Sequence, residues 1–143
     1  MPSSVAHALL LSSFLCSMAC QPDPKPAVSF VGGYEGNGTL TTLNGSNPAM
    51  NPIEPVTIYV KKRDAQSDTL QVSILNRSGV LNDPLPAITN AQTLVIVGPT
   101  PALPDRSVAG MGTLSGDTLR LSLTERTHSA TNQYRFTALR LPI

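Results

Sequence analysis

The chain has 143 residues, 13% of them charged, and a formal net charge of +1. This balance provides no electrostatic footprint for nucleic acid or for another strongly charged partner. With no tryptophan and only 4% aromatic residues, the chain also lacks a platform on which nucleotide bases would stack. We therefore expect no nucleic-acid partner.

The N-terminal segment, residues 1–19, is predicted to be an export signal. Its apolar run covers residues 5–15, which is shorter than the roughly 20 apolar residues that a membrane-spanning helix needs. Ser17 and Ala19 place small side chains third-last and last before Cys20. This is the spacing that a signal peptidase with shallow pockets requires.

Cys20 resembles the cysteine of the bacterial lipoprotein lipobox, whose thiol is diacylated before the signal is cleaved. The resemblance implies a membrane partner bound through acyl chains on Cys20, and two such chains give stable attachment. An ordinary secretory signal that leaves Cys20 as a free thiol is the alternative. Cys16 would leave with the signal, so the mature chain would contain no disulfide, in keeping with an oxidising compartment.

Residues 20–27 are predicted to link this cysteine to a single domain at residues 28–143. Pro22, Pro24 and Pro26 alternate with other residues, a composition that favours an extended, semi-rigid polyproline II spacer. The segment lacks a strongly acidic stretch, since Gln21 follows Cys20 and only Asp23 is acidic nearby. We therefore expect the periplasmic side of an outer membrane rather than the cell surface.

Alternating polar and apolar residues predict β-strands in the first half of the domain. Residues 30–43 form the first, with one face made by Tyr34, Gly36, Gly38 and Leu40. Residues 44–55 contain three prolines and are predicted to be a loop. Residues 56–63 and the strand that starts at Leu70 form a predicted hairpin around a turn at residues 64–68.

The connection that follows, residues 76–92, is unusually apolar for a solvated loop. It carries Val80, Leu81, Leu85 and Ile88. These residues are predicted to pack as a lid, or residues 87–89 begin a further strand, and the pattern leaves both open. Residues 94–97 are predicted to form a buried strand, followed by a proline-containing loop at residues 98–107.

The last third predicts another hairpin and a final strand. Residues 108–114 and the strand from Leu119 flank a two-residue turn, Gly116-Asp117. Leu119, Leu121 and Leu123 are expected to face inward. In residues 133–141 two alternations compete for the interior: Tyr134, Phe136 and Ala138 against Leu139 and Leu141.

These seven or eight short strands predict an all-β fold, an antiparallel meander that closes into a small barrel. Closure is expected because it hides the exposed edges of the first and last strands. A two-sheet β-sandwich is the alternative. Two short sequence repeats, GNGTL at residues 36–40 and GMGTL at residues 110–114, indicate glycine-bent strands in both halves.

Three features together resemble small bacterial lipoproteins of the Bacteroidota type with a lipocalin-like (calycin) β-barrel. They are Gly32-Gly33-Tyr34 in the first strand, the Gly-x-Gly-Thr-Leu and Gly-Asp-Thr-Leu hairpin at residues 110–119, and Arg140 in the last strand. In calycins an arginine of the last strand covers an aromatic residue of the first. The resemblance therefore implies that Tyr34 and Arg140 form a structural pair that closes the barrel base.

No set of residues has catalytic or metal-binding spacing. His128 lies in a polar turn and is the one histidine after Cys20, so zinc and copper sites of the usual kind are not expected. Carboxylates such as Asp117 and Glu125 are predicted in turns or on solvent-facing strand positions. The basic run at residues 61–63 is predicted to be a solvated strand end, with contact to a phosphate or lipid headgroup as the alternative. We therefore expect neither an enzyme nor a cofactor.

The predicted function is that of an envelope-anchored, non-catalytic binding module for a small apolar ligand. In a meander the loops at residues 44–55 and 76–92 fall at the same end, where they would form a mouth. Val80, Leu81, Leu85 and Ile88 would be its apolar lid. The alternative is an accessory or inhibitor protein of the periplasm that binds an envelope protein through these loops or through the face that carries Tyr59.

Overall fold

The computed structural model describes residues 29–43, 48–66, 68–76, 81, 83–98 and 105–142. The predicted signal, Cys20, the proline spacer and Val80 lie outside the described residues. The described chain forms eight strands. They are β1 (Gly32–Leu43), β2 (Ala49–Lys62), β3 (Leu70–Asn76), β4 (Leu85–Asn90), β5 (Thr93–Ile96), β6 (Ser107–Ser115), β7 (Thr118–Arg126) and β8 (Thr131–Arg140).

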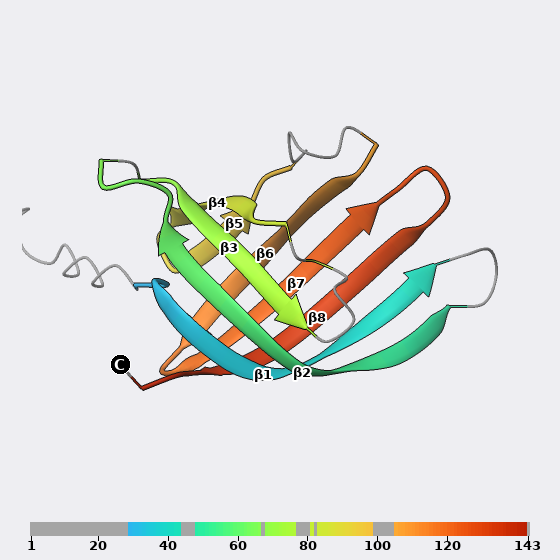
Figure 1. The fold of residues 1–143 in the computed structure, drawn as a ribbon, viewed down its shortest axis with the longest axis horizontal. Coiled ribbons are helices and arrows are strands. Elements are labelled where there is room, and N and C mark those ends of the chain that lie inside the picture. Colours follow the sequence, from blue (N-terminus) through green and yellow to red (C-terminus); the bar gives the residue numbers. More distant parts are fainter. Residues whose placement is uncertain are drawn as a thin grey trace, which may run out of the picture.

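Each strand pairs antiparallel with its sequence neighbours, and β8 returns to pair with β1, so the sheet closes into a barrel (Figure 1). The closing ladder runs from Tyr34 opposite Arg140 to Leu43 opposite Thr131. The all-β meander and its closure into a barrel are therefore confirmed, and the sandwich alternative is wrong.

Inward-facing side chains fill the barrel. The largest fully buried ones include Tyr34, Tyr134, Phe30 and Phe136, and the rings of Tyr134 and Phe136 stack with centroids 6.1 Å apart. This packing is expected because eight strands enclose a space just wide enough for side chains. In β8 the aromatic alternation faces inward, whereas Leu139 is 61% exposed.

Strand β2 is longer than predicted. It begins at Ala49, so residues 49–55, predicted to be a loop, belong to the strand. These residues pair with β1 only, because the ladder between β2 and β3 begins at Val56. A strand that is paired on one side tolerates prolines, which lack the backbone N–H donor, and this explains why Pro52 and Pro55 do not end it.

Residues 87–89 belong to β4, which brings the number of strands in the described ranges to eight. A two-residue turn at residues 91–92 connects β4 to β5, and Ala91 adopts a φ of 53° there. The predicted hairpin between β6 and β7 is confirmed, with Gly116 at a φ of 58° in its turn.

The two glycine repeats share a structural basis. A Cβ atom on Gly36 would overlap the carbonyl oxygen of Thr137 in β8, and one on Gly110 would overlap that of Ser122 in β7. Each glycine therefore lets its strand approach the neighbouring backbone closely. The second glycines make room for large inward side chains: Gly38 faces Phe136, and Gly112 faces Leu121.

The barrel has two unlike ends. The short-turn end holds the start of β1, the end of β8 and the connections at residues 63–69, 91–92 and 116–117. The long-loop end holds the connections at residues 44–48, 77–84, 97–106 and 127–130. Figure 1 shows the start of β1 and the C-terminal residues at the left, with the end of β1 at the opposite side. The connections after β1 and β3 thus share one end, as the meander predicts.

Candidate functional site

At the short-turn end, Arg140 covers the ring of Tyr34, with 5.1 Å between the guanidinium carbon and the ring centroid. Arg140 donates hydrogen bonds to the carbonyl oxygens of Ser29 (2.6 Å) and Val31 (3.0 Å). The Tyr34 hydroxyl donates to the carbonyl oxygen of Phe30 at 2.7 Å. The pair thereby holds three consecutive carbonyls and positions Phe30, which is 1% exposed, in the core. Burial raises the pKa of the Tyr34 phenol, although the nearby Arg140 opposes the shift.

The residues of the predicted apolar lid divide between the interior and the outer surface. Leu81 and Leu85 are each 2% exposed and belong to the core at the barrel wall. Ile88, in contrast, is 44% exposed on the outer face of β4. The structure therefore brings Leu81 and Leu85 into one cluster and leaves Ile88 apart, and their role in ligand binding stays a prediction.

A buried polar network lies toward the long-loop end. Glu125 is the one charged side chain buried within the described ranges, at 5% exposure. Its Oε2 accepts hydrogen bonds from the Tyr134 hydroxyl (2.5 Å) and from Nδ2 of Asn132 (3.0 Å), and its Oε1 pairs with the Arg106 guanidinium. Arg106 in turn lies 3.6 Å from the Asp83 carboxylate, measured from Nη1 to Oδ2. Both carboxylate oxygens of Glu125 are therefore engaged.

The network joins two connections at the long-loop end to strand β7 of the barrel wall. Arg106 ends the connection before β6 and Asp83 lies in the connection before β4, whereas Glu125 belongs to β7. Burial raises the pKa of the Tyr134 phenol, and the Glu125 carboxylate raises it further. The phenol therefore keeps its proton and donates it in the hydrogen bond. A buried carboxylate held by three donors is suited to fixing structure rather than to accepting a substrate proton.

The burial of Glu125 corrects the prediction that placed it in a turn or on a solvent-facing position. The alternation of Leu119, Leu121 and Leu123 already contained the signal, because the next inward position of the same strand is 125. A charged residue at an inward position requires a buried partner, and Arg106 supplies it.

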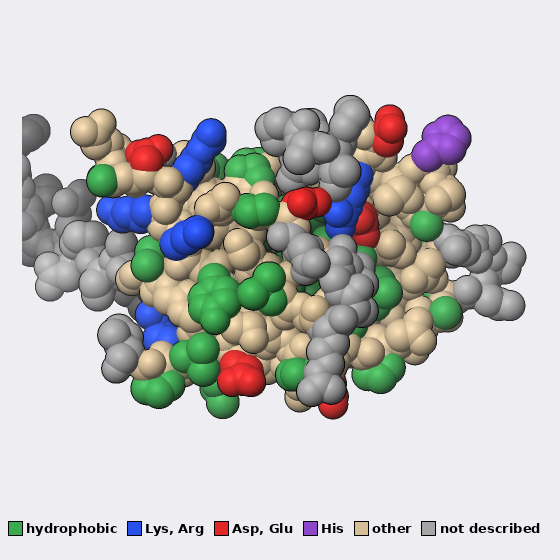
Figure 2. All heavy atoms as spheres, viewed as in Figure 1, with side chains coloured by type: hydrophobic (Ala, Val, Ile, Leu, Met, Phe, Trp, Pro, Cys, Tyr) green, Lys and Arg blue, Asp and Glu red, His purple; other side chains and the backbone are tan. Residues whose placement is uncertain are grey.

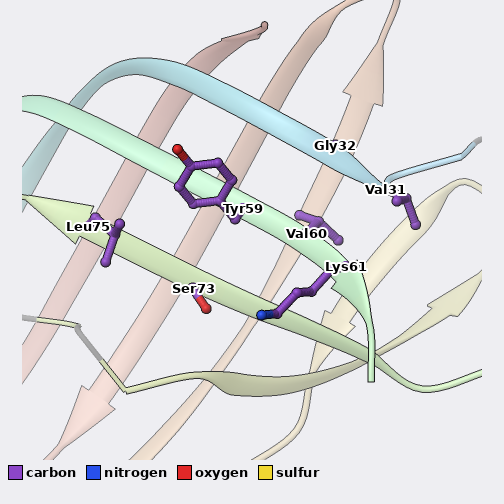
Figure 3. Close-up of a pocket in the computed structure, with 7 residues that line it drawn as sticks. All are labelled: Val31, Gly32, Tyr59, Val60, Lys61, Ser73 and Leu75. Atoms are coloured by element: carbon purple, nitrogen blue, oxygen red, sulfur yellow. The ribbon is translucent and has the colours of Figure 1, made fainter. Parts of the chain in front are cut away.

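The outer face of β2 and β3 carries a groove of about 510 Å³ beside the start of β1 (Figure 3). Tyr59 and Leu75 are each 44% exposed, and Val31 is 40% exposed. Figure 3 shows Tyr59 and Lys61 of β2 beside Ser73 and Leu75 of β3. The lining residues are Val31, Gly32, Tyr59, Val60, Lys61, Ser73 and Leu75. We call this surface the wall groove.

Cationic side chains lead from the wall groove to the short-turn end. Lys61 lines the groove, and Lys62 and Arg63 follow it, all three exposed. Figure 2 shows hydrophobic side chains over β2 and β3 with Lys and Arg side chains beside them. Asp64 and Asp68 lie further along the turn between the two strands.

Among the described residues, no three His, Cys, Asp or Glu side chains converge as a metal site. His128 is exposed in the turn between β7 and β8. In the same part of the chain, no helix is long and apolar enough to span a membrane.

No protein-family model matches the chain, and no curated protein matches it. A similar solved structure is the isotype 1 transferrin binding protein B of serogroup B Neisseria meningitidis, with a TM-score of 0.51 and 12% identity over 83% of this chain. The likeness is one of fold. A second is a transferrin binding protein B of Haemophilus parasuis Hp5, at 13% identity over 76% of this chain, with a TM-score of 0.46. This chain spans only 26% of the length of either protein.

Proposed function

We propose that the chain is a non-catalytic binding module, anchored in the cell envelope by acyl chains on Cys20, which presents its long-loop end to its ligand. The relative position of the two barrel ends carries this proposal. The described chain starts at Ser29 beside the short-turn end, so an anchor that precedes it joins the barrel at this end and leaves the long connections at the opposite end. The Arg106–Glu125 pair supports the proposal because binding loops work best on a rigid scaffold.

The first candidate ligand is a small apolar molecule bound at the long-loop end. The apolar character of the connection after β3 favours it, although Leu81 and Leu85 themselves are packed in the core. Such a ligand would sit at the mouth, because large side chains, Tyr134 and Phe136 among them, occupy the interior.

The second candidate is an envelope protein, for which the chain would be a periplasmic accessory or inhibitor. The filled interior favours this candidate over a ligand held deep inside the barrel. The structurally similar proteins are named for binding transferrin, and their shared fold is compatible with a protein ligand.

The anchor is tested by labelling growing cells with an alkyne-tagged fatty acid. The parent chain should incorporate the label, whereas Cys20→Ser should not. Cys16→Ser is the matched control and should be labelled like the parent, because Cys16 precedes the cleavage site. A labelled Cys20→Ser protein, or an unlabelled parent, would show that Cys20 is not the anchor.

The ligand is tested by native mass spectrometry of protein purified from membranes, together with photo-crosslinking. A small apolar ligand should appear as one reproducible added mass. A protein ligand should instead be trapped by a photoreactive residue at Ser129, which is exposed at the long-loop end, and not by one at Met111, which is 62% exposed on the wall. If the purified protein shows no added mass and the photoreactive residue at Ser129 traps no specific partner, the proposal is overturned.

A further inference from the structure

We propose that the wall groove and the cations beside it form a second contact surface, which lies against an anionic membrane surface. This inference assigns a role to the barrel wall rather than to the long-loop end. It rests on the proposed function in one respect, because the Cys20 anchor brings the barrel close to the membrane.

The apolar part of this surface comes from three strands or their flanks. Val31 precedes β1, Tyr59 lies in β2 and Leu75 in β3, and each is at least 40% exposed. Single exposed apolar residues are normal on protein surfaces, but these three converge on one hollow. Tyrosine suits a membrane interface because its ring is apolar and its hydroxyl stays in contact with water.

Positive and negative side chains are distributed unevenly along the barrel axis around the groove. Lys61, Lys62 and Arg63 lie toward the short-turn end. Glu35, exposed on β1, pairs with Thr57, which is further from that end than Tyr59. Asp64 lies beyond the cations, and its Oδ1 accepts a hydrogen bond from the Gln66 backbone N–H at 3.1 Å. Lys61 therefore makes the edge of the groove nearest the short-turn end cationic, Lys62 and Arg63 extend the positive charge beyond that edge, and this charge complements anionic headgroups.

The start of the described chain favours a membrane as the occupant. Residues 21–28 separate Cys20 from Ser29, and a fully extended chain between these two positions covers at most about 30 Å. Val31 itself lines the groove. A membrane that holds Cys20 is therefore within reach of the groove, and this reach favours a membrane over an acidic protein segment, which shares the same chemistry.

A single tryptophan tests the contact directly, because the chain has none of its own. The acylated Tyr59→Trp variant is reconstituted in vesicles of phosphatidylglycerol and phosphatidylethanolamine that contain brominated lipid. We expect blue-shifted emission and strong quenching by the bromine atoms. The matched control is Met50→Trp, at a position that is 71% exposed near the long-loop end, and its emission should stay unquenched. Equal quenching of the two variants, or none in either, would overturn the inference.

The cations are tested without the anchor. The Cys20→Ser protein should sediment with phosphatidylglycerol vesicles, and changing Lys61, Lys62 and Arg63 to glutamine should weaken this binding about fivefold per cation. Arg135→Gln, at an exposed position of β8, should leave it unchanged. Binding that is equal in the triple variant and the parent would contradict the proposal.

These measurements separate the inference from the proposed function. If the parent is not labelled but the Cys20→Ser protein binds vesicles through the three cations, the acyl anchor is refuted and the membrane-contact surface is supported. If the protein is acylated but the Tyr59→Trp variant is not quenched, the anchor is supported and the membrane-contact surface is refuted. The wall groove would then be a candidate site for a protein partner.

Discussion

The Tyr134 hydroxyl donates a hydrogen bond to the Glu125 carboxylate inside the barrel, with 2.5 Å between Oη and Oε2. A buried carboxylate destabilises a fold unless it is paired and hydrogen-bonded. Here the guanidinium of Arg106 and the amide of Asn132 complete its set of partners. The stability of the long-loop end therefore depends on a few polar side chains.

Replacing Glu125 by glutamine should destabilise the protein substantially. The variant keeps the size of the side chain but removes the charge that pairs with Arg106, whose side chain is only 18% exposed. We expect the free energy of unfolding to fall by about 3 kcal/mol, the lower end for breaking a buried ion pair. Urea denaturation measures this, with Glu35→Gln on the exposed face of β1 as the control, expected within about 0.5 kcal/mol of the parent. Equal losses in the two variants would contradict a role for the network.

Alkaline pH should destabilise the protein. Burial raises the pKa values of Tyr34 and Tyr134 above the ordinary value of 10.0 in the folded state. Above about pH 10 the unfolded chain loses these protons first, so the folded state binds more protons and the free energy of unfolding falls as pH rises. Below that pH the two phenols keep their protons in both states, so their contribution to the free energy of unfolding does not change with pH.

The measurement is the free energy of unfolding between about pH 9 and pH 11. Tyr134→Phe should show a shallower decline than the parent because one buried phenol is gone. Tyr59→Phe, at a 44% exposed position, is the control and should decline like the parent. An identical slope in the Tyr134→Phe variant would argue against the buried phenol as the cause.

Replacing Arg140 by lysine should make the residues that precede β1 more mobile. Lysine keeps the positive charge but cannot donate to Ser29 and Val31 at the same time with a planar fork. We expect a loss of about 1–2 kcal/mol and faster amide hydrogen exchange around residues 29–34. Arg135→Lys, exposed on the same strand, should change neither quantity. Unchanged amide exchange in the Arg140→Lys variant would show that the hydrogen bonds of Arg140 do not hold residues 29–34 in place.

A methyl group at Gly36 should impair barrel closure. The added Cβ would overlap the Thr137 carbonyl, so β1 and β8 must separate. We expect a loss of about 3 kcal/mol or more. Gly116→Ala is the comparison, because no atom lies within 4 Å of its Cβ and only its φ of 58° opposes alanine, at about 1 kcal/mol. Thermal unfolding should rank Gly36→Ala as clearly the less stable, and the reverse order would contradict the close-approach explanation.

The amino-acid pattern predicted the barrel because alternation reports directly which strand face is buried. Leu119, Leu121 and Leu123 show this most simply, and the glycine repeats marked strands that approach their neighbours closely. Residues 49–55 were predicted wrongly because prolines usually end strands. Their one-sided pairing, which the pattern does not display, removes that obstacle.

The candidate sites were harder to predict than the fold. The wall groove joins Val31, Tyr59 and Leu75, which are distant in sequence and meet only through the register of three strands. The inward position of Glu125 was predicted wrongly although the alternation of its strand contained the signal, and its partner Arg106 comes from a connection with no pattern of its own.

Closure of the barrel also limits how the protein can recognise others. The backbone groups of β1 and β8 are used in their common ladder from Tyr34 to Leu43, so neither strand offers a free edge to a strand of another molecule. Two copies of the chain therefore cannot join sheet to sheet through these strands. Recognition through β1 and β8 therefore passes to their side chains, so specificity there can change by single substitutions while the ladder between them stays as it is.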